Sequence, residues 1–225
     1  MVGTLLSTAV AVGIAAVGWT IASKIQSVRG YWKKCQSETI ANAHGVKCSS
    51  WLSNDDKDTK TATWFRINDV IMGGKSTSEL STDSENRLVF SGIINTDGGG
   101  FASMRTSEAC VVKVPSGASS VKLTVEGDGH LWKANLGLGH SLMDSNPTFS
   151  HDFLTKKDTV TIHNLPLAGF AAQRRGQTLD GVALEDPSKI QYVGLILSLV
   201  TQEGKPNPHF GDGPFRIVLH ELEFV

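Results

Sequence analysis

Apolar residues along most of this chain fall in short runs, and glycine, aspartate, asparagine and proline separate the runs. In residues 120–126, SVKLTVE, apolar and polar positions alternate one by one. Alternation with a period of two is typical of a strand that buries one face and exposes the other. Many short runs of this kind predict an all-β protein whose strands pack as a sandwich.

The runs that predict strands are each rich in Val, Ile, Phe, Leu or Thr. The predicted strands are residues 63–67, 87–95, 101–106, 120–126, 130–136, 148–154, 158–163, 190–201 and 215–225. Turns at 127–129 and 211–214 contain glycine, which adopts backbone angles that other residues resist. This set of strands is enough for two packed sheets.

The N-terminus has a different pattern, because residues 2–23 contain no charged side chain. A helix of about 20 such residues, rising about 1.5 Å per residue, spans the roughly 30 Å hydrocarbon core of a bilayer. Four basic residues, at 24, 29, 33 and 34, follow this stretch, whereas a secretory signal peptide carries its basic residues before the apolar run. Residues 1–34 are therefore predicted to be a retained transmembrane anchor with a basic flank.

Basic residues on the C-terminal flank predict that the body of the protein lies on the cytoplasmic or mitochondrial matrix side. Ala9 and Gly13 are four residues apart, a spacing that lets a second transmembrane helix approach closely. Two other interpretations stay open: an anchor that simply contains small residues, and a buried soluble helix. The residues assigned to the anchor are Leu5, Leu6, Ala9, Gly13, Ile14, Val17, Trp19 and Ile21.

Residues 35–61 are polar and poorly periodic, so they are predicted to be a linker before a β-domain at 62–225. The formal net charge of −1 supplies no general attraction for nucleic acid. Cys35, Cys48 and Cys110 are too few and too irregularly spaced for a disulfide framework or a zinc site, and we expect free thiols. No cofactor is expected.

Several motifs, taken in order, resemble one protein family. They are WFRIND at 64–69, MGGKS at 72–76, FSG at 90–92, GGFASMR at 99–105, VEGDG at 125–129, LPLAGF at 165–170, RRG at 174–176, VGLI at 193–196 and GPFRI at 213–217. Their order and spacing resemble the complex I intermediate-associated protein 30 family over about residues 62–225.

This resemblance implies a galactose-binding-like jelly roll without catalytic activity, active in the assembly of mitochondrial respiratory complex I at the inner membrane. The expected partners are the membrane and protein subunits of a respiratory complex, with the β-domain on the matrix side. The chain is short and carries its own anchor where the family resemblance leads us to expect a cleavable targeting sequence. Both departures favour a resident membrane protein, such as an accessory subunit, over a transient soluble chaperone.

The polar and glycine residues of the family-like motifs are the candidate site. Charges near a sandwich core need partners because isolated burial is costly, so a structural network of carboxylates and guanidinium groups is one interpretation. A polar surface that docks a partner peptide is the other, since arginine binds carboxylates through forked hydrogen bonds. The candidates are Asp69, Gly73, Gly74, Arg105, Asp128, Arg174 and Arg175.

Other motifs favour no specific chemistry. The GKS at 74–76 resembles the end of a phosphate loop, but Asp69 stands where that motif needs glycine and no helix pattern follows, which indicates a tight turn. Residues 97–100, DGGG, read as a hairpin loop or as a close approach to a ligand. The seven histidines show no metal-binding spacing, and no nucleophile motif is present.

Two alternatives compete with an assembly role. A carbohydrate-binding module is suggested by the implied jelly roll, and it requires an exposed aromatic platform of the kind that Trp64 and Trp132 would supply. An enzyme is suggested only by scattered polar residues such as Asp128 and Arg175.

Overall fold

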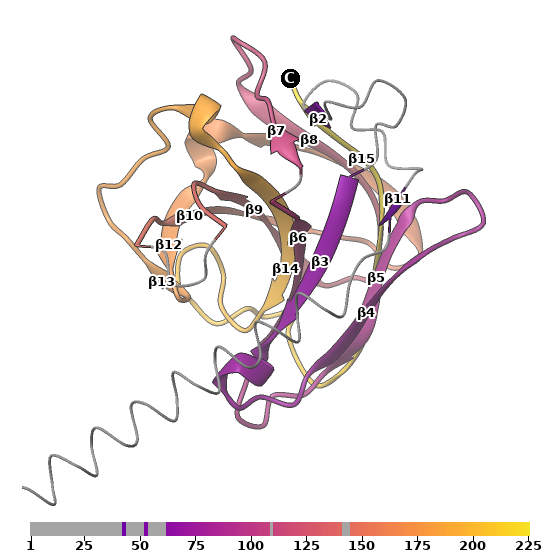
Figure 1. Cartoon of the computed structure of the whole chain (residues 1–225). Coiled ribbons are helices and arrows are strands. Elements are labelled where there is room, and N and C mark those ends of the chain that lie inside the picture. The colour runs from indigo at the N-terminus through magenta and orange to yellow at the C-terminus, as the bar shows by residue number, and fades with distance from the viewer. Residues whose placement is uncertain (1–41, 44–51, 54–61, 109, 141–144) are drawn as a thin grey trace, which may run out of the picture. The chain divides into compact units, whose positions relative to one another are not determined.

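The computed structural model describes residues 42–43, 52–53, 62–108, 110–140 and 145–225 (Figure 1). The predicted anchor at 1–34 and most of the predicted linker lie outside the described residues. In the part that is described, no helix has both the length and the apolar character needed to cross a membrane. The predicted boundaries between anchor, linker and β-domain stay predictions.

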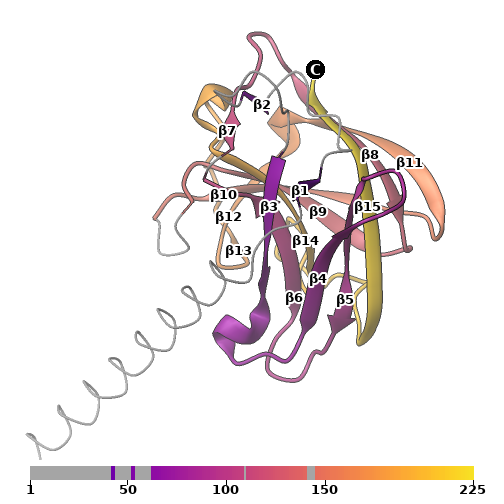
Figure 2. The same ribbon diagram turned by 45° about the vertical axis from the view of Figure 1, so that its right-hand side comes forward.

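The described chain forms two antiparallel sheets that lie face to face (Figures 1 and 2). The eight-stranded sheet has the order β1 (Asn42–Ala43), β3 (Ala62–Asn68), β6 (Phe101–Thr106), β14 (Tyr192–Ser198), β9 (Leu131–Gly137), β10 (Thr148–Leu154), β12 (Ala171–Arg174) and β13 (Gln177–Thr178). The five-stranded sheet has the order β11 (Thr159–Pro166), β8 (Ser120–Gly127), β15 (Gly213–Phe224), β5 (Leu88–Ile94) and β4 (Thr77–Thr82).

Short elements complete the fold. Strands β2 (Leu52–Ser53) and β7 (Val111–Val112) pair with each other, and the 3-10 helices η1 (Asp69–Met72), η2 (Leu167–Gly169) and η3 (Pro187–Lys189) lie in connections. The predicted all-β sandwich is therefore confirmed.

The core lies between the two sheets. It is built from the apolar side chains on the inward faces of the strands. Trp132 of β9 and Phe90 and Phe215 of the facing sheet form a cluster with ring centroids 5.1–6.1 Å apart. Trp64 and Trp132 are both 0% exposed. In β8, the apolar residues of the SVKLTVE motif are buried, as their alternation predicts.

Cys110 is a free, buried thiol, as expected, whereas the other two cysteines lie outside the described residues. The predicted strand at 190–201 is too long, since β14 ends at Ser198 and only an isolated bridge joins Val200 to Pro206. The predicted strand at 158–163 is too short, because its pairing with β8 continues to Pro166.

Candidate functional site

Asp69 begins η1 and is 0% exposed. Its Oδ1 accepts a hydrogen bond from the backbone N–H of Ser76 at 3.1 Å, and its Oδ2 accepts one from the Ser76 hydroxyl at 2.7 Å. The backbone N–H of Phe101 also donates to Oδ2, at 3.4 Å. Asp69 therefore ties the end of β3 to the starts of β4 and β6.

The glycines of this region leave space for the Asp69 carboxylate. A Cβ added to Gly74 would lie 2.3 Å from Asp69 Cγ, and one added to Gly99 would lie 2.3 Å from Asp69 Oδ2. Gly73 has a φ of 92°, which ends η1 in a left-handed conformation that favours glycine. Gly73 and Gly74 thus form the predicted tight turn, and the DGGG motif packs against it through Gly99.

Asp128 follows β8 and lies in a different part of the sandwich. Its Oδ1 accepts hydrogen bonds from the His130 backbone N–H at 3.1 Å and the Trp132 indole N–H at 3.2 Å. Its Oδ2 accepts one from the Arg216 backbone N–H at 2.8 Å and lies 2.9 Å from His130 Nδ1. Asp128 therefore orients a core tryptophan and links the end of β8 to β15.

The surroundings of Asp128 stabilise its charged form. Burial by itself raises the pKa of Asp128, but hydrogen bonds from the His130 side chain and from backbone N–H groups outweigh this effect. The pKa of Asp128 consequently lies below its ordinary value. A carboxylate held in this way is suited to a structural role, because each oxygen already has partners within the chain.

Arg105 on β6 is buried and stacks against two aromatic rings. Its guanidinium carbon lies 4.8 Å from the Phe65 ring centroid and 4.5 Å from that of Tyr192, and Nη2 donates a hydrogen bond to the His140 carbonyl. Burial lowers the pKa of Arg105, which Tyr192 and Glu108 oppose only in part. These cation–π contacts stabilise the arginine where water is excluded.

Arg174 and Arg175 are exposed at the turn between β12 and β13. Arg174 donates a hydrogen bond to the carbonyl of Ser145, and Arg175 has a φ of 53° in the turn. Among the contacts that the structure describes, none joins two of the charged candidates. Asp69 and Asp128 are held by other groups, so the two exposed arginines are the candidates left with side chains on the surface.

One buried charged residue of this sheet, Lys133, was not predicted from the sequence. Lys133 of β9 is 4% exposed, and its Nζ donates to Gln173 Oε1 at 3.2 Å. Burial lowers the pKa of Lys133 to about 8, although Asp152 opposes this. Gln173 in turn donates to the carbonyls of Thr201 and Gln202, at 2.9 and 3.0 Å. In the sequence, Lys133 looks like any outward-facing strand residue.

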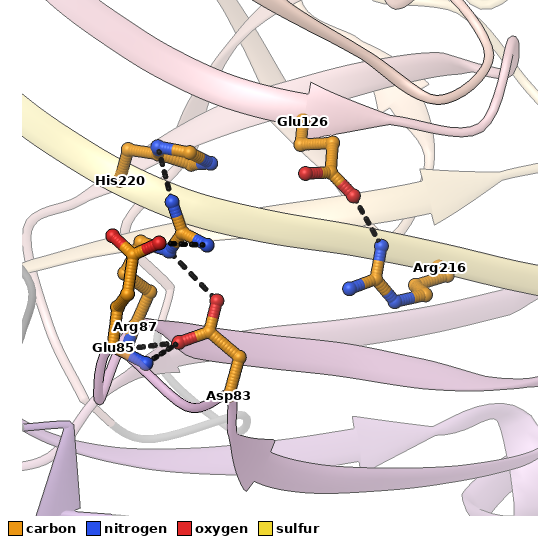
Figure 3. Close-up of polar contacts among 6 residues, drawn as sticks. All are labelled: Asp83, Glu85, Arg87, Glu126, Arg216 and His220. Carbon is orange, nitrogen blue, oxygen red and sulfur yellow. Dashed lines mark hydrogen bonds and ion pairs between the residues drawn. The ribbon is translucent and has the colours of Figure 1, made fainter.

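Ion pairs lie at the turn between β4 and β5 and on the outer face of the five-stranded sheet (Figure 3). Arg87 lies 2.7 Å from Asp83 and 3.3 Å from Glu85, and its Nη1 lies 3.3 Å from His220 Nδ1. Burial, followed by the charge of Arg87, lowers the pKa of His220. Arg87 thus pairs with carboxylates of the β4–β5 turn and also contacts a histidine of β15.

Beside them, Arg216 pairs with Glu126 at 2.6 Å, and Lys122 lies within 3.4 Å of both Glu221 and Glu223. No group of three His, Cys, Asp or Glu side chains within the described ranges is arranged to hold a metal ion.

Comparison with solved structures finds distant similarities. A family 11 carbohydrate-binding module of a cellulosomal cellulase from Clostridium thermocellum aligns at 9% identity with a TM-score of 0.48, covering 74% of this chain and 91% of the module. The Clostridium thermocellum family 11 module in complex with a β-1,3-1,4-mixed-linked tetrasaccharide aligns at 11% identity with a TM-score of 0.47. This alignment covers 75% of this chain and 92% of the module. At these values the similarities say nothing of what this chain binds.

Comparison with curated proteins finds no match. The profile of one family, described as complex I intermediate-associated protein 30, matches residues 52–219. The matched range contains the Asp69 turn, the Asp128 turn, the buried Arg105 and most strands of both sheets. A match that spans most of the chain and all of these features establishes that the chain belongs to the complex I intermediate-associated protein 30 family.

Proposed function

We propose that this chain is a non-catalytic, membrane-anchored protein of the mitochondrial inner membrane that acts in the assembly of respiratory complex I or as its accessory subunit. The observation that carries the proposal is the family match over residues 52–219. In this proposal the two-sheet sandwich is a galactose-binding-like jelly roll on the matrix side, and residues 1–34 hold it at the membrane.

The chemistry of the candidate residues supports a structural role. The carboxylates of Asp69 and Asp128 accept hydrogen bonds from backbone and side-chain donors of the same chain. A general acid or base needs a reacting group within hydrogen-bond distance, and these oxygens are already engaged. Arg174 and Arg175, by contrast, are exposed and suited to docking a carboxylate-bearing partner.

The carbohydrate-binding alternative requires an exposed aromatic platform, and Trp64 and Trp132 do not supply one. Trp64 and Trp132, which would form an aromatic platform, are both fully buried in the core. They pack the two sheets together and present no face to a sugar ring. A glycan array probed with the full-length chain supplies the remaining test of this alternative, and retention of no glycan would remove it.

Native electrophoresis of inner membranes solubilised in mild detergent tests the proposed function. The tagged full-length chain is expected to comigrate with complex I or with its intermediates, and its depletion is expected to reduce fully assembled complex I. Migration only as free protein, with complex I at its normal level after depletion, would contradict the proposal.

Replacing Arg174 and Arg175 together by Gln is expected to weaken comigration while the thermal unfolding curve stays unchanged, because both side chains are exposed. Arg216→Gln is the matched control, since that arginine lies on the other sheet and pairs with Glu126. Equal comigration of all three proteins would exclude these arginines from the docking surface.

A further inference from the structure

One end of the sandwich, where β3 is followed by η1, exposes large apolar side chains (Figure 2). On η1, Val70 is 47% exposed and Met72 is 74% exposed, the highest value among the large apolar residues that the structure describes. In the connection after β14, Leu199 is 49% exposed. We call Val70, Met72 and Leu199 the apolar tip.

Glycines join the members of the apolar tip into one surface. A Cβ added to Gly98 would lie 3.1 Å from the carbonyl oxygen of Gly73, so Gly98 packs against the turn that ends η1. A Cβ added to Gly100 would lie 3.0 Å from Leu199 Cβ, and the Leu199 N–H donates to the Gly100 carbonyl at 2.9 Å. Residues 98–100 thus lie between η1 and Leu199, with no side chain of their own to separate the two.

The charged side chains that border the apolar tip in the sequence have partners within the chain. Lys75 follows the turn after η1 and Asp97 precedes the glycines, and their side chains form an ion pair. Asp69, the first residue of η1, is 0% exposed, and its carboxylate accepts hydrogen bonds from Ser76. Contact of the tip with an apolar environment therefore leaves these three charges with the partners that they already have.

The direction of β1 indicates from which side the chain enters the eight-stranded sheet. Asn42 pairs with Thr63 and Ala43 pairs with Ala62, so β1 runs antiparallel to β3. Because β3 runs toward η1, β1 runs away from it, and Asn42 lies nearer to η1 than Ala43 does. The chain therefore enters this sheet from the side of the apolar tip.

The predicted anchor limits how far the sandwich can lie from a bilayer. Lys34, the last residue of the predicted anchor and its basic flank, precedes Asn42 by eight positions. Eight residues span at most about 29 Å. The five residues from Thr63, the partner of Asn42, to the end of β3 at Asn68 span about 17 Å. A tether of this length reaches the level of η1 and keeps the sandwich close to the bilayer, so lipid is the apolar environment within reach of the tip.

We propose that the apolar tip rests in the membrane interface, with Val70 and Met72 in contact with lipid. The inference rests on the membrane anchor of the proposed function. A domain tethered to a bilayer meets it at a high effective concentration, so a contact too weak to bind a free domain is still populated. Apolar side chains insert about 5–10 Å into the boundary between headgroups and acyl chains, a depth that accommodates the short helix η1. The contact fixes which end of the sandwich faces the membrane and leaves the opposite end open to protein partners.

A fluorescent probe at position 72 tests the proposal in the full-length chain. In a chain with Cys35 and Cys48 replaced by Ser, and with the buried Cys110 kept, Met72→Cys is labelled with nitrobenzoxadiazole and reconstituted into phosphatidylcholine–cardiolipin vesicles. Iodide is expected to quench this probe at least about fivefold less than a probe on Ile162→Cys, because the membrane interface excludes the anion. Ile162 is the matched control, since it is 67% exposed on β11, at the other edge of the five-stranded sheet from β4.

A charge placed beside the probe tests whether the apolar side chains cause its protection. Val70→Asp is expected to raise iodide quenching of the position-72 probe to within about twofold of the Ile162 probe, because a carboxylate on η1 opposes insertion. Val182→Asp is the matched control, since Val182 is 43% exposed in the connection between β13 and η3, and it should leave the protection unchanged. Equal protection in both variants would show that apolar contact does not hold the tip in lipid.

Flotation of the same vesicles separates this inference from the proposed function. A chain that floats with the vesicles while its position-72 probe is quenched as strongly as the Ile162 probe retains the anchor and overturns the lipid contact. A chain that does not float overturns the anchor and the contact together. A probe that is accessible in these vesicles but protected in native mitochondrial membranes shows that a protein covers the tip, which also overturns the lipid contact.

Discussion

At the scale of single residues, Asp69 links three backbone segments through one buried carboxylate. Replacing it with alanine leaves the Ser76 hydroxyl and two backbone N–H groups without their acceptor. We expect Asp69→Ala to lower the free energy of unfolding by about 3 kcal/mol, since unsatisfied buried donors are costly. Urea unfolding of the full-length chain measures this. Asp97→Ala is the control, because Asp97 is exposed and forms an exposed ion pair with Lys75, and it should leave the midpoint unchanged.

A substitution at Gly99 tests whether the same turn has room for a side chain. An alanine Cβ there would lie 2.3 Å from Asp69 Oδ2 and 2.8 Å from Gly74 Cα, so the turn must shift. We expect Gly99→Ala to destabilise the fold by about 2 kcal/mol through overpacking. Gly211→Ala is the matched control, because a Cβ at Gly211 meets nothing within 4 Å. Equal melting temperatures for the two variants would refute the packing argument.

The buried Lys133 should make the free energy of unfolding depend on pH. Its pKa is about 8 in the folded chain, against an ordinary value of 10.5. Between these values the unfolded chain binds more protons, so stability rises with pH from about 8 to 10.5, by at most about 3 kcal/mol. Lys133→Met should remove this rise, which urea unfolding of both proteins across that pH range measures. Parallel pH profiles would show that Lys133 is not the titrating group.

The sequence identified several residues of the candidate site but not their partners. Asp69 and Asp128 were chosen as candidates because they are polar members of the motifs that resemble the family. The partners could not be predicted, since the Arg216 N–H that binds Asp128 lies 88 positions away. The aromatic contacts of Arg105 depend on strand order in the same way, because Phe65 and Tyr192 come from β3 and β14.

At the scale of elements, strands with one buried face were predictable. The bounds of β6 and β10 agree with the prediction, and both strands have apolar residues in the core. Strand β4, TSELST, was missed because its residues are polar and mostly exposed, and pairing with β5 places it in the sheet. Strand β12 was missed because four residues, AAQR, are too short for a period to be visible.

The connection at 199–207 depends on side chains of the eight-stranded sheet. Gln173 donates to the carbonyls of Thr201 and Gln202, so its loss releases two contacts of that segment. Gln173→Ala also removes the acceptor of Lys133 Nζ on β9, so we expect it to increase amide hydrogen exchange about tenfold at 199–207 while β14 keeps its protection. Gln177→Ala, which removes an exposed glutamine of β13, should leave exchange unchanged. Uniform loss of protection in the Gln173 variant would indicate global destabilisation instead.

At the scale of the whole molecule, the sandwich was predicted from strand alternation, whereas the membrane anchor is a prediction from composition alone. The alternating strands each have one apolar face, and such faces are buried by stacking one sheet on another. The anchor prediction uses a separate principle, the cost of charge in hydrocarbon. Because the two inferences share no residue, a substitution can test one without disturbing the other.

Charges placed within residues 2–23 should detach the chain from membranes. Replacing Ile14 and Val17 by Asp puts two carboxylates near the middle of the uncharged stretch, at a cost of about 3 kcal/mol each for insertion. After alkaline carbonate extraction of mitochondrial membranes, the wild-type chain should stay in the pellet and the double variant should move to the supernatant. Thr82→Asp, an exposed change on β4, should stay with the pellet, since charge on the β-domain does not affect the span. A wild-type chain found in the supernatant would remove the anchor from the proposed function.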